Sequence, residues 1–133
     1  MNSINNENLR ESERKWIEAI VSKKFLYRED IINQINCAEV YRNYTEYYIS
    51  LKFKVDTNWV NQIHTNIRVP VEMRVLKLGK IPVQFLLHIV QGYIHELEIF
   101  NADSSKIDEK IILENAEIEI IINPELKCCM SLL

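Results

Sequence analysis

Two apolar stretches that meet at Gln91-Gly92 form the clearest pattern in the chain. Residues 83–90 are apolar at almost every position, and such a run predicts a buried central strand. Residues 93–100 alternate between polar and apolar side chains, which is typical of a strand with two different faces. Gly92 tolerates the positive φ that a tight turn requires. The pattern therefore predicts a β-hairpin in the middle of the fold.

A regular alternation would divide the second strand of this hairpin between two faces. One face would carry Ile94, Glu96, Glu98 and Phe100, and the other Tyr93, His95, Leu97 and Ile99. Two carboxylates, those of Glu96 and Glu98, are therefore expected to point the same way from one strand.

The first forty residues show helical spacing instead. Apolar side chains recur from Leu9 to Val21, with Asn8 expected as the N-cap and Glu11 as its partner in a capping box. A second helix is predicted over residues 28–38. Its buried stripe is expected to consist of Ile31, Ile32 and Ile35. The two segments predict a helical hairpin whose apolar side packs on a sheet.

The rest of the chain supplies strands for that sheet. Further strands are predicted over residues 40–44, 47–55, 68–77 and 116–123, with Pro70 placing the start of the third at an edge and Pro124 ending the last. Residues 56–66 fit a loop or one helical turn, and residues 106–113 fit no single pattern. Helices followed by strands with short turns predict an α+β fold, with the helical hairpin packed on a mainly antiparallel sheet of about five or six strands. Residues 1–133 are expected to form one domain, with 1–7 and 125–133 flexible or peripheral.

Composition narrows the class of protein. A hydrophobic fraction of 47% and a charged fraction of 26% are those of an ordinary globular protein. Nineteen acidic and sixteen basic residues give a net charge of −3, which argues against a nucleic-acid partner. No apolar run approaches the length of a membrane span, and no signal-peptide pattern is visible. The odd count of three cysteines, Cys37, Cys128 and Cys129, is typical of reduced thiols, so a cytoplasmic location without membrane association is expected.

The histidines of the hairpin are the first candidate for chemistry. With a two-residue turn at Gln91-Gly92, His88 and His95 would be cross-strand neighbours, whereas a three-residue turn would place His88 opposite Glu96. Either pairing is compatible with a metal site, with an acid–base pair or with a hydrogen-bonded structural histidine. The chain has no C-x-x-C or H-E-x-x-H spacing. We therefore expect no catalytic residue, metal ligand or cofactor site.

Surface carboxylates and tyrosines form the second candidate. The carboxylates are Glu96, Glu98, Glu117 and Glu119, and the tyrosines are Tyr44, Tyr47 and Tyr48, with Tyr41 and Trp59 nearby in sequence. The glutamates fit either a solvated sheet face or, if their two strands are adjacent, an acidic surface for a basic partner protein. The tyrosines fit either ordinary strand packing or an interface, since tyrosine and tryptophan are enriched at interface hot spots.

The residues from Gly92 to Ser105, G-Y-I-H-E-L-E-I-F-N-A-D-S-S, are similar to a motif of small, mostly uncharacterised bacterial proteins. That group shows an N-terminal helical segment, a sheet, and a G-x-(I/L)-x-E-L-E-(I/V)-(F/Y) strand followed by an Asp-containing loop. Some members resemble immunity proteins that neutralise a neighbouring toxin. Members often carry Asp-Gly in the loop, whereas this chain has Asp103-Ser104.

Three hypotheses of function follow from the sequence. The first is a non-enzymatic cytoplasmic binding protein, an immunity or antitoxin protein that occludes a partner protein such as a toxin. The second is a small hydrolase, metal-dependent or acid–base, that uses His88, His95 and Glu96. The third is a homodimeric protein that pairs sheet edges or faces and has no other partner. A toxin gene directly upstream would favour the first, and bound metal in the purified protein would favour the second.

Overall fold

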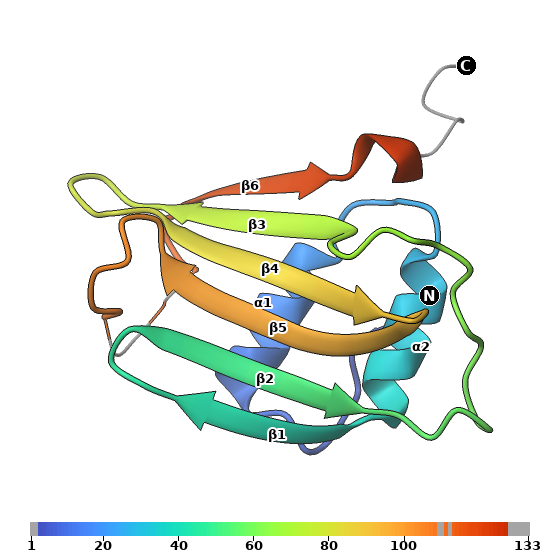
Figure 1. Ribbon diagram of the computed structural model, residues 1–133. Helices are drawn as coiled ribbons and strands as arrows, with labels where there is room; N and C mark the ends of the chain where they lie inside the picture. The colour runs from blue at the N-terminus through green and yellow to red at the C-terminus, as the bar shows by residue number, and fades with distance from the viewer. Residues whose placement is uncertain (1–2, 109–110, 112, 128–133) are drawn as a thin grey trace.

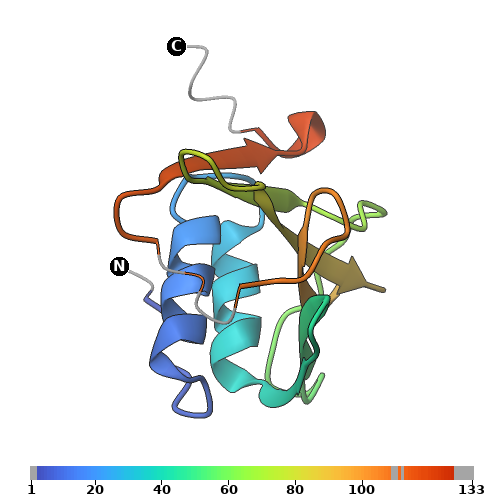
Figure 2. The ribbon, with the colours of Figure 1, turned by 90° about the vertical axis from the view of Figure 1, so that its left-hand side faces the viewer.

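The computed structural model describes residues 3–108, 111 and 113–127, and it has two layers (Figures 1 and 2). Two helices cover one face of a single antiparallel sheet with the strand order β1-β2-β5-β4-β3-β6. The elements are α1 (Glu11–Ile20), α2 (Arg28–Cys37), β1 (Glu39–Tyr44), β2 (Tyr48–Lys54), β3 (Val71–Leu76), β4 (Val83–Val90), β5 (Tyr93–Asn101), β6 (Glu117–Ile122) and the short 3-10 helix η1 (Pro124–Leu126). The predicted α+β class, with a helical hairpin preceding the strands, is confirmed.

The core lies between the helices and the sheet. The strands contribute alternate residues to it, and the fully buried ones include Leu51, Met73, Phe85, Leu87, Leu97 and Ile99. β4 alternates as well, although its apolar sequence predicts a strand buried on both faces. The helices contribute Trp16, Ile17, Ile20, Ile31, Ile32 and Ile35. The ring of Trp16 meets that of Phe85 edge to face at a centroid distance of 5.9 Å, so α1 packs on the middle of the sheet.

The first helix begins two residues later than the sequence predicts. Its N-cap is Arg10 rather than Asn8, because the carboxylate of Glu13 reaches back and accepts the backbone N–H of Arg10 at 2.8 Å. The buried stripe predicted for α2 is confirmed: Ile31, Ile32 and Ile35 are all enclosed.

The described N-terminal residues are packed against the fold, which differs from the flexible or peripheral segment expected for residues 1–7. Ile4 and Asn6 are buried. The side-chain nitrogen of Asn6 donates to the carbonyls of Ile35 and Ala38 at 2.7 and 2.8 Å. Carbonyls at the end of a helix lack partners within the helix, so this side chain serves as the C-terminal cap of α2. At the other end of the chain Leu126 is also buried, and residues 128–133, with Cys128-Cys129, lie outside the described residues.

The central hairpin combines both registers that the sequence leaves open. Val90 pairs with Tyr93 across a two-residue turn, yet His88 pairs with Glu96, because the ladder shifts between His88 and Ile89. A β-bulge of this kind places one extra residue in one strand. Ile94 therefore points into the core with Leu97 and Ile99, and His95 is exposed. The predicted division of β5 into faces is thus correct from Glu96 onward and wrong before it.

The side chain of Gln34 binds the hairpin from the helix side of the sheet. This side chain is completely buried on α2, where its oxygen accepts the backbone N–H of Ile94 at 2.6 Å. Its nitrogen donates to the carbonyls of Asn61 at 2.7 Å and Gly92 at 3.1 Å. A buried amide that satisfies three backbone groups fixes the bulge and the neighbouring loop together.

We expect Gly92→Ala to destabilise the protein more than Gly79→Ala. Both glycines have positive φ, 82° and 74° respectively, so alanine is strained at either position by about 1 kcal/mol. A Cβ at Gly92 would in addition collide with the backbone of Ile63, whereas a Cβ at Gly79 would meet nothing within 4 Å. Urea denaturation should therefore show a loss of roughly 3 kcal/mol or more for Gly92→Ala. Equal losses for the two variants would contradict the close approach.

The remaining strands have nearly the bounds that the sequence predicts, but not all of them occupy the predicted place in the sheet. β3 is an internal strand, so the expectation that its start lies at an edge is wrong; Pro70 directly precedes the strand and its carbonyl accepts the N–H of Asn123. Residues 56–66 form a loop with one turn at residues 57–59 and no helix, and Trp59 is largely exposed. The chain reaches β6 on the helix side of the sheet, where Trp16 donates to the carbonyl of Ile111 at 3.3 Å. None of the described helices has the length and apolar character that a membrane crossing requires.

Candidate functional site

The candidate site is the face of the sheet that the helices leave uncovered, called the outer face below. Figure 1 looks onto this face, and Figure 2 shows that both helices lie behind it. Of the residues singled out in the sequence, the register places Tyr48, Glu96 and Glu98 on this face, on the adjacent strands β2 and β5. The strands alternate, so the outer positions of β2, β5 and β4 include Tyr48, Ser50, Lys52, Glu96, Glu98, Phe100, Gln84, Leu86 and His88.

Glu98 and His88 are joined by a hydrogen bond. The distance from His88 Nε2 to a carboxylate oxygen of Glu98 is 3.1 Å, and Arg68 Nε donates to His88 Nδ1, also at 3.1 Å. Because Nδ1 accepts, the neutral ring carries its proton on Nε2 and donates it to Glu98. The imidazole is thus held from both sides, and its side chain is only 13% exposed. The arrangement orients Glu98 on the outer face.

Glu96 is held from the opposite side of β5. The hydroxyl of Ser50 on β2 donates to a carboxylate oxygen of Glu96 at 2.5 Å. Lys52 lies directly opposite Glu96 in the ladder between β2 and β5. The two carboxylates of β5 are therefore each fixed by a neighbouring strand, and each retains lone pairs for a further donor.

An apolar group lies beside these carboxylates. Tyr48 pairs with Phe100 across β2 and β5, and Leu86 pairs with Glu98 across β4 and β5. All three apolar side chains are half-buried although no described helix covers them. An apolar centre with a rim of polar groups is the usual anatomy of a protein interface.

The other pair of predicted carboxylates lies elsewhere on the same face. β6 is at the edge of the sheet next to β3, and two strands separate it from β5, so the idea that the two acidic strands are neighbours is wrong. Arg74 of β3 stands opposite Glu119. Together with Lys52, this arginine interrupts the acidic surface, so the outer face has mixed charge.

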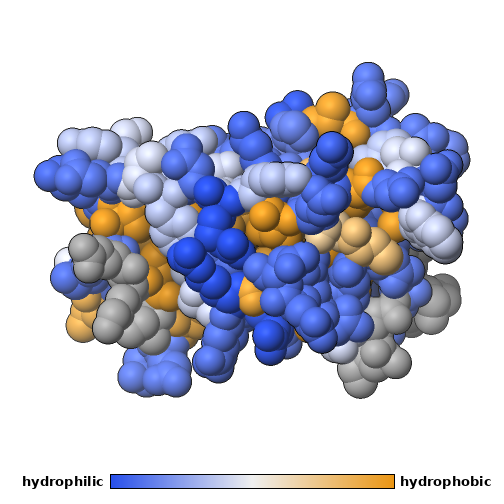
Figure 3. All heavy atoms as spheres, turned by 90° about the horizontal axis from the view of Figure 1, so that it is seen from below, coloured by the Kyte–Doolittle hydropathy of each residue, from blue (hydrophilic) through white to orange (hydrophobic). Residues whose placement is uncertain are grey.

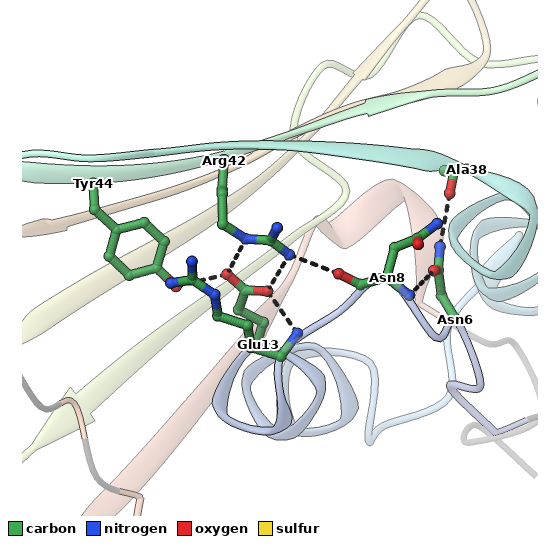
Figure 4. A network of polar contacts seen from close by, with 7 residues as sticks. Asn6, Asn8, Glu13, Ala38, Arg42 and Tyr44 are labelled. Carbon is green, nitrogen blue, oxygen red and sulfur yellow. Dashed lines mark hydrogen bonds and ion pairs between the residues drawn. The ribbon is translucent and has the colours of Figure 1, made fainter.

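Tyr44 faces the helices and belongs to a structural network (Figure 4). Its hydroxyl donates to Glu13 at 2.6 Å, and Arg42 donates to both oxygens of the same carboxylate at 2.8 and 3.0 Å. The guanidinium of Arg10 lies 5.3 Å from the centre of the Tyr44 ring. This network ties the start of α1 to the edge strand β1, so the main contacts of Tyr44 are internal. Tyr47, in contrast, is exposed in the turn between β1 and β2.

The electrostatics of the network follow from burial and hydrogen bonding. Burial acts to raise the pKa of Glu13, but hydrogen bonds from Arg42, Tyr44 and the backbone of Arg10 outweigh it and hold that pKa below its usual value. Burial and the hydrogen bond to Glu13 raise the pKa of Tyr44, which therefore stays protonated. Glu13 is therefore a charged acceptor at neutral pH.

The residues of the hydrolase hypothesis do not converge. His88 is occupied by Glu98 and Arg68, and His95 is exposed at the bulge, separated in register from His88. Glu96 is bound by Ser50 rather than by either histidine. Within the described part of the chain, no group of three or more histidine, cysteine, aspartate or glutamate residues is arranged to hold a metal ion.

The loop after β5 is part of the segment that resembles the motif of small bacterial proteins, and its conformation can be compared with the Asp-Gly that members of that group often carry. Ser104 adopts a positive φ of 63°, the conformation for which glycine is the usual choice. Asp103 accepts the N–H of Ser105 at 3.0 Å, and hydrogen bonds from Ser105 lower the pKa of this carboxyl. The turn thus forms with serine where members of the resembling group often carry glycine.

Comparison with known proteins adds no family to this description. No family model matches the chain, and neither the curated proteins nor the solved structures yield a match. The functional argument therefore rests on the geometry of the molecule.

Several residues of the outer face were not recognised as candidate site residues from the sequence. Ser50 and Leu86 look like ordinary strand residues, and their role depends on which strands become neighbours of β5. Arg68 lies in a loop, twenty positions before the histidine that it contacts. The polar position of His88 within an otherwise apolar strand was the available signal, because such a residue needs a hydrogen-bond partner.

Proposed function

We propose that the protein is a non-enzymatic binding protein whose outer face receives a partner protein. The observation that carries this proposal is the combination on one open face of half-buried apolar residues, Tyr48, Leu86 and Phe100, with two oriented carboxylates, Glu96 and Glu98. Fixed polar groups around an apolar centre lower the entropic cost of binding, because little has to become ordered.

The chemistry of the outer face indicates what kind of partner fits. Each carboxylate of β5 can accept a further hydrogen bond, so a lysine or arginine of the partner is the natural counterpart of Glu96 or Glu98. The apolar centre favours an aromatic or aliphatic side chain that packs on Tyr48, Phe100 and Leu86. The resemblance of residues 92–105 to a motif of immunity-like proteins supports a toxin as that partner, which the bound protein would occlude.

The proposal predicts that Leu86→Lys abolishes partner binding while the fold survives. Leu86 lies between Glu98 and Glu72 in the ladders, so a lysine there has two acidic neighbours but destroys the apolar centre. The matched control is Leu78→Lys, since Leu78 is fully exposed in the turn between β3 and β4. In affinity capture from the source organism, the wild type and Leu78→Lys should retain the same protein, and Leu86→Lys should retain at least about tenfold less.

Two further measurements, thermal melting and growth, decide the outcome. Thermal melting of both lysine variants should resemble that of the wild type, which separates lost binding from lost folding. If the captured protein is a toxin, expression with the wild type should restore growth, and expression with Leu86→Lys should not. Full retention of the partner by folded Leu86→Lys would refute the outer face as the binding surface.

A further inference from the structure

The free edge of β6 is a second surface that can bind another chain, through backbone hydrogen bonds. β6 is the last strand of the sheet and pairs only with β3 among the described residues. Asn123, next to the end of β6, donates its N–H to Pro70 on the β3 side. Backbone groups of an antiparallel strand alternate in direction, so those of Ile118, Ile120 and Ile122 point to the open edge.

The two edges of the sheet differ in how they are protected. β1 carries an inward-pointing charge, Arg42, which Glu13 neutralises, and such charges discourage pairing with another chain. Figure 3 views the molecule from the β1 side and shows strongly hydrophilic residues across the middle of it. β6 has no lysine, proline or inward charge. Its inward residues are Ile118, Ile120 and Ile122. Ile118 is 37% exposed, and Ile121 on the outer face is 41% exposed.

We propose that β6 pairs antiparallel with β6 of a second copy of this chain. A two-fold axis perpendicular to the sheet would pass through Ile120, so that Ile120 faces its own copy and Ile118 faces Ile122 of the second copy. Because all three residues direct their backbone groups to the edge, this register forms about six hydrogen bonds. The two sheets become one continuous sheet with all helices on the same side.

Charge selects this register. With Ile120 on the axis, Glu119 lies opposite Ile121 of the second copy, and Glu117 lies opposite Asn123. With Glu119 on the axis, the two copies of Glu119 would lie directly opposite each other, which is unfavourable for like charges. The glutamates of β6 therefore do not prevent self-pairing; they determine its register.

The decisive test compares two substitutions of opposite charge at Ile121. Sedimentation equilibrium of the full chain measures the oligomeric state of each variant. Ile121→Glu places a carboxylate opposite Glu119 of the second copy, whereas Ile121→Lys places an ammonium group there. The wild type should be dimeric, Ile121→Glu should dissociate at least about tenfold more readily, and Ile121→Lys should dimerise as well as the wild type or better. Both variants also lie opposite Glu72 of their own chain, so their melting temperatures are measured alongside.

Two more variants make the result unambiguous. Ile120→Pro removes an N–H that points to the open edge and leaves the bonds between β6 and β3 in place, so it should be monomeric. Leu86→Lys changes the outer face only and should remain dimeric. The proposal is overturned if the wild type is monomeric up to about 200 µM. It is overturned equally if Ile121→Glu and Ile120→Pro dimerise like the wild type, or if Leu86→Lys is the variant that dissociates.

Discussion

Leu87→Asp should yield a chain that does not fold. Leu87 is completely buried in β4, between Val71 of β3 and Leu97 of β5. An aspartate there would be a charge without a partner in the core, or would have to become protonated, and either cost is about 4 kcal/mol or more. Loss of the buried leucine side chain costs about 2–5 kcal/mol more. The two costs together are comparable with the whole free energy of unfolding of a domain of this size, which is only about 5–15 kcal/mol.

The measurement is thermal melting followed by circular dichroism, with Leu86→Lys as the control. The control changes the adjacent residue of the same strand to a charge, but on the outer face, so it should melt cooperatively. Leu87→Asp should be insoluble or lack a cooperative transition. A Leu87→Asp protein that melts cooperatively within a few degrees of the wild type would show that β4 is not the centre of the core.

Glu13→Gln should destabilise the protein by about 2–4 kcal/mol at neutral pH. The carboxylate of Glu13 is 0% exposed and accepts hydrogen bonds from Arg42, Tyr44 and the backbone N–H of Arg10. Removing one partner of a buried ion pair leaves the other without compensation, although Arg42 is 26% exposed and water offsets part of the loss. Glu11→Gln is the matched control, because Glu11 lies in the same first turn but is exposed.

The effect of Glu13→Gln should depend on pH. The pKa of Glu13 is lower in the folded protein than its usual value, so the unfolded chain binds the proton more readily. The stabilisation is therefore complete above the unfolded pKa of about 4.3 and is lost as the pH falls through the folded pKa. Urea denaturation should show a large difference between the wild type and Glu13→Gln at pH 7 and a smaller one near pH 3. A difference that does not shrink in acid would mean that the charge of Glu13 is not what stabilises the network.

Local patterns in the sequence predict most of the elements. The alternation of β2 and β6, the apolar run of β4 and the helical spacing of α2 give these elements nearly the observed bounds. What local patterns do not contain is the pairing of strands distant in sequence. β5 lies between β2 and β4, and β6 pairs with β3, so the acidic strands are apart and the outer face has mixed charge.

The remaining errors come from buried polar side chains. The bulge before Glu96 exists because Gln34, sixty positions earlier, accepts the N–H that the ladder releases at Ile94. The start of α1 is set by Glu13, whose other partners lie on β1. Both residues occupy the apolar stripe of their helices, and a polar residue in such a stripe signals a buried, paired group. The sequence contains that signal but not the identity of the partner.

The central claim is that the outer face contacts a partner protein, and crosslinking in living cells tests it most directly. A photoreactive benzoylphenylalanine replaces Tyr41, which is 55% exposed on the outer face of β1, or Leu26, which is 49% exposed in the loop between α1 and α2. Mass spectrometry distinguishes an adduct with a different protein from an adduct with a second copy of this chain. The account predicts that light produces an adduct with one different protein from position 41 and none from position 26. Adducts with a different protein from position 26 alone, or equally from both positions, would contradict it.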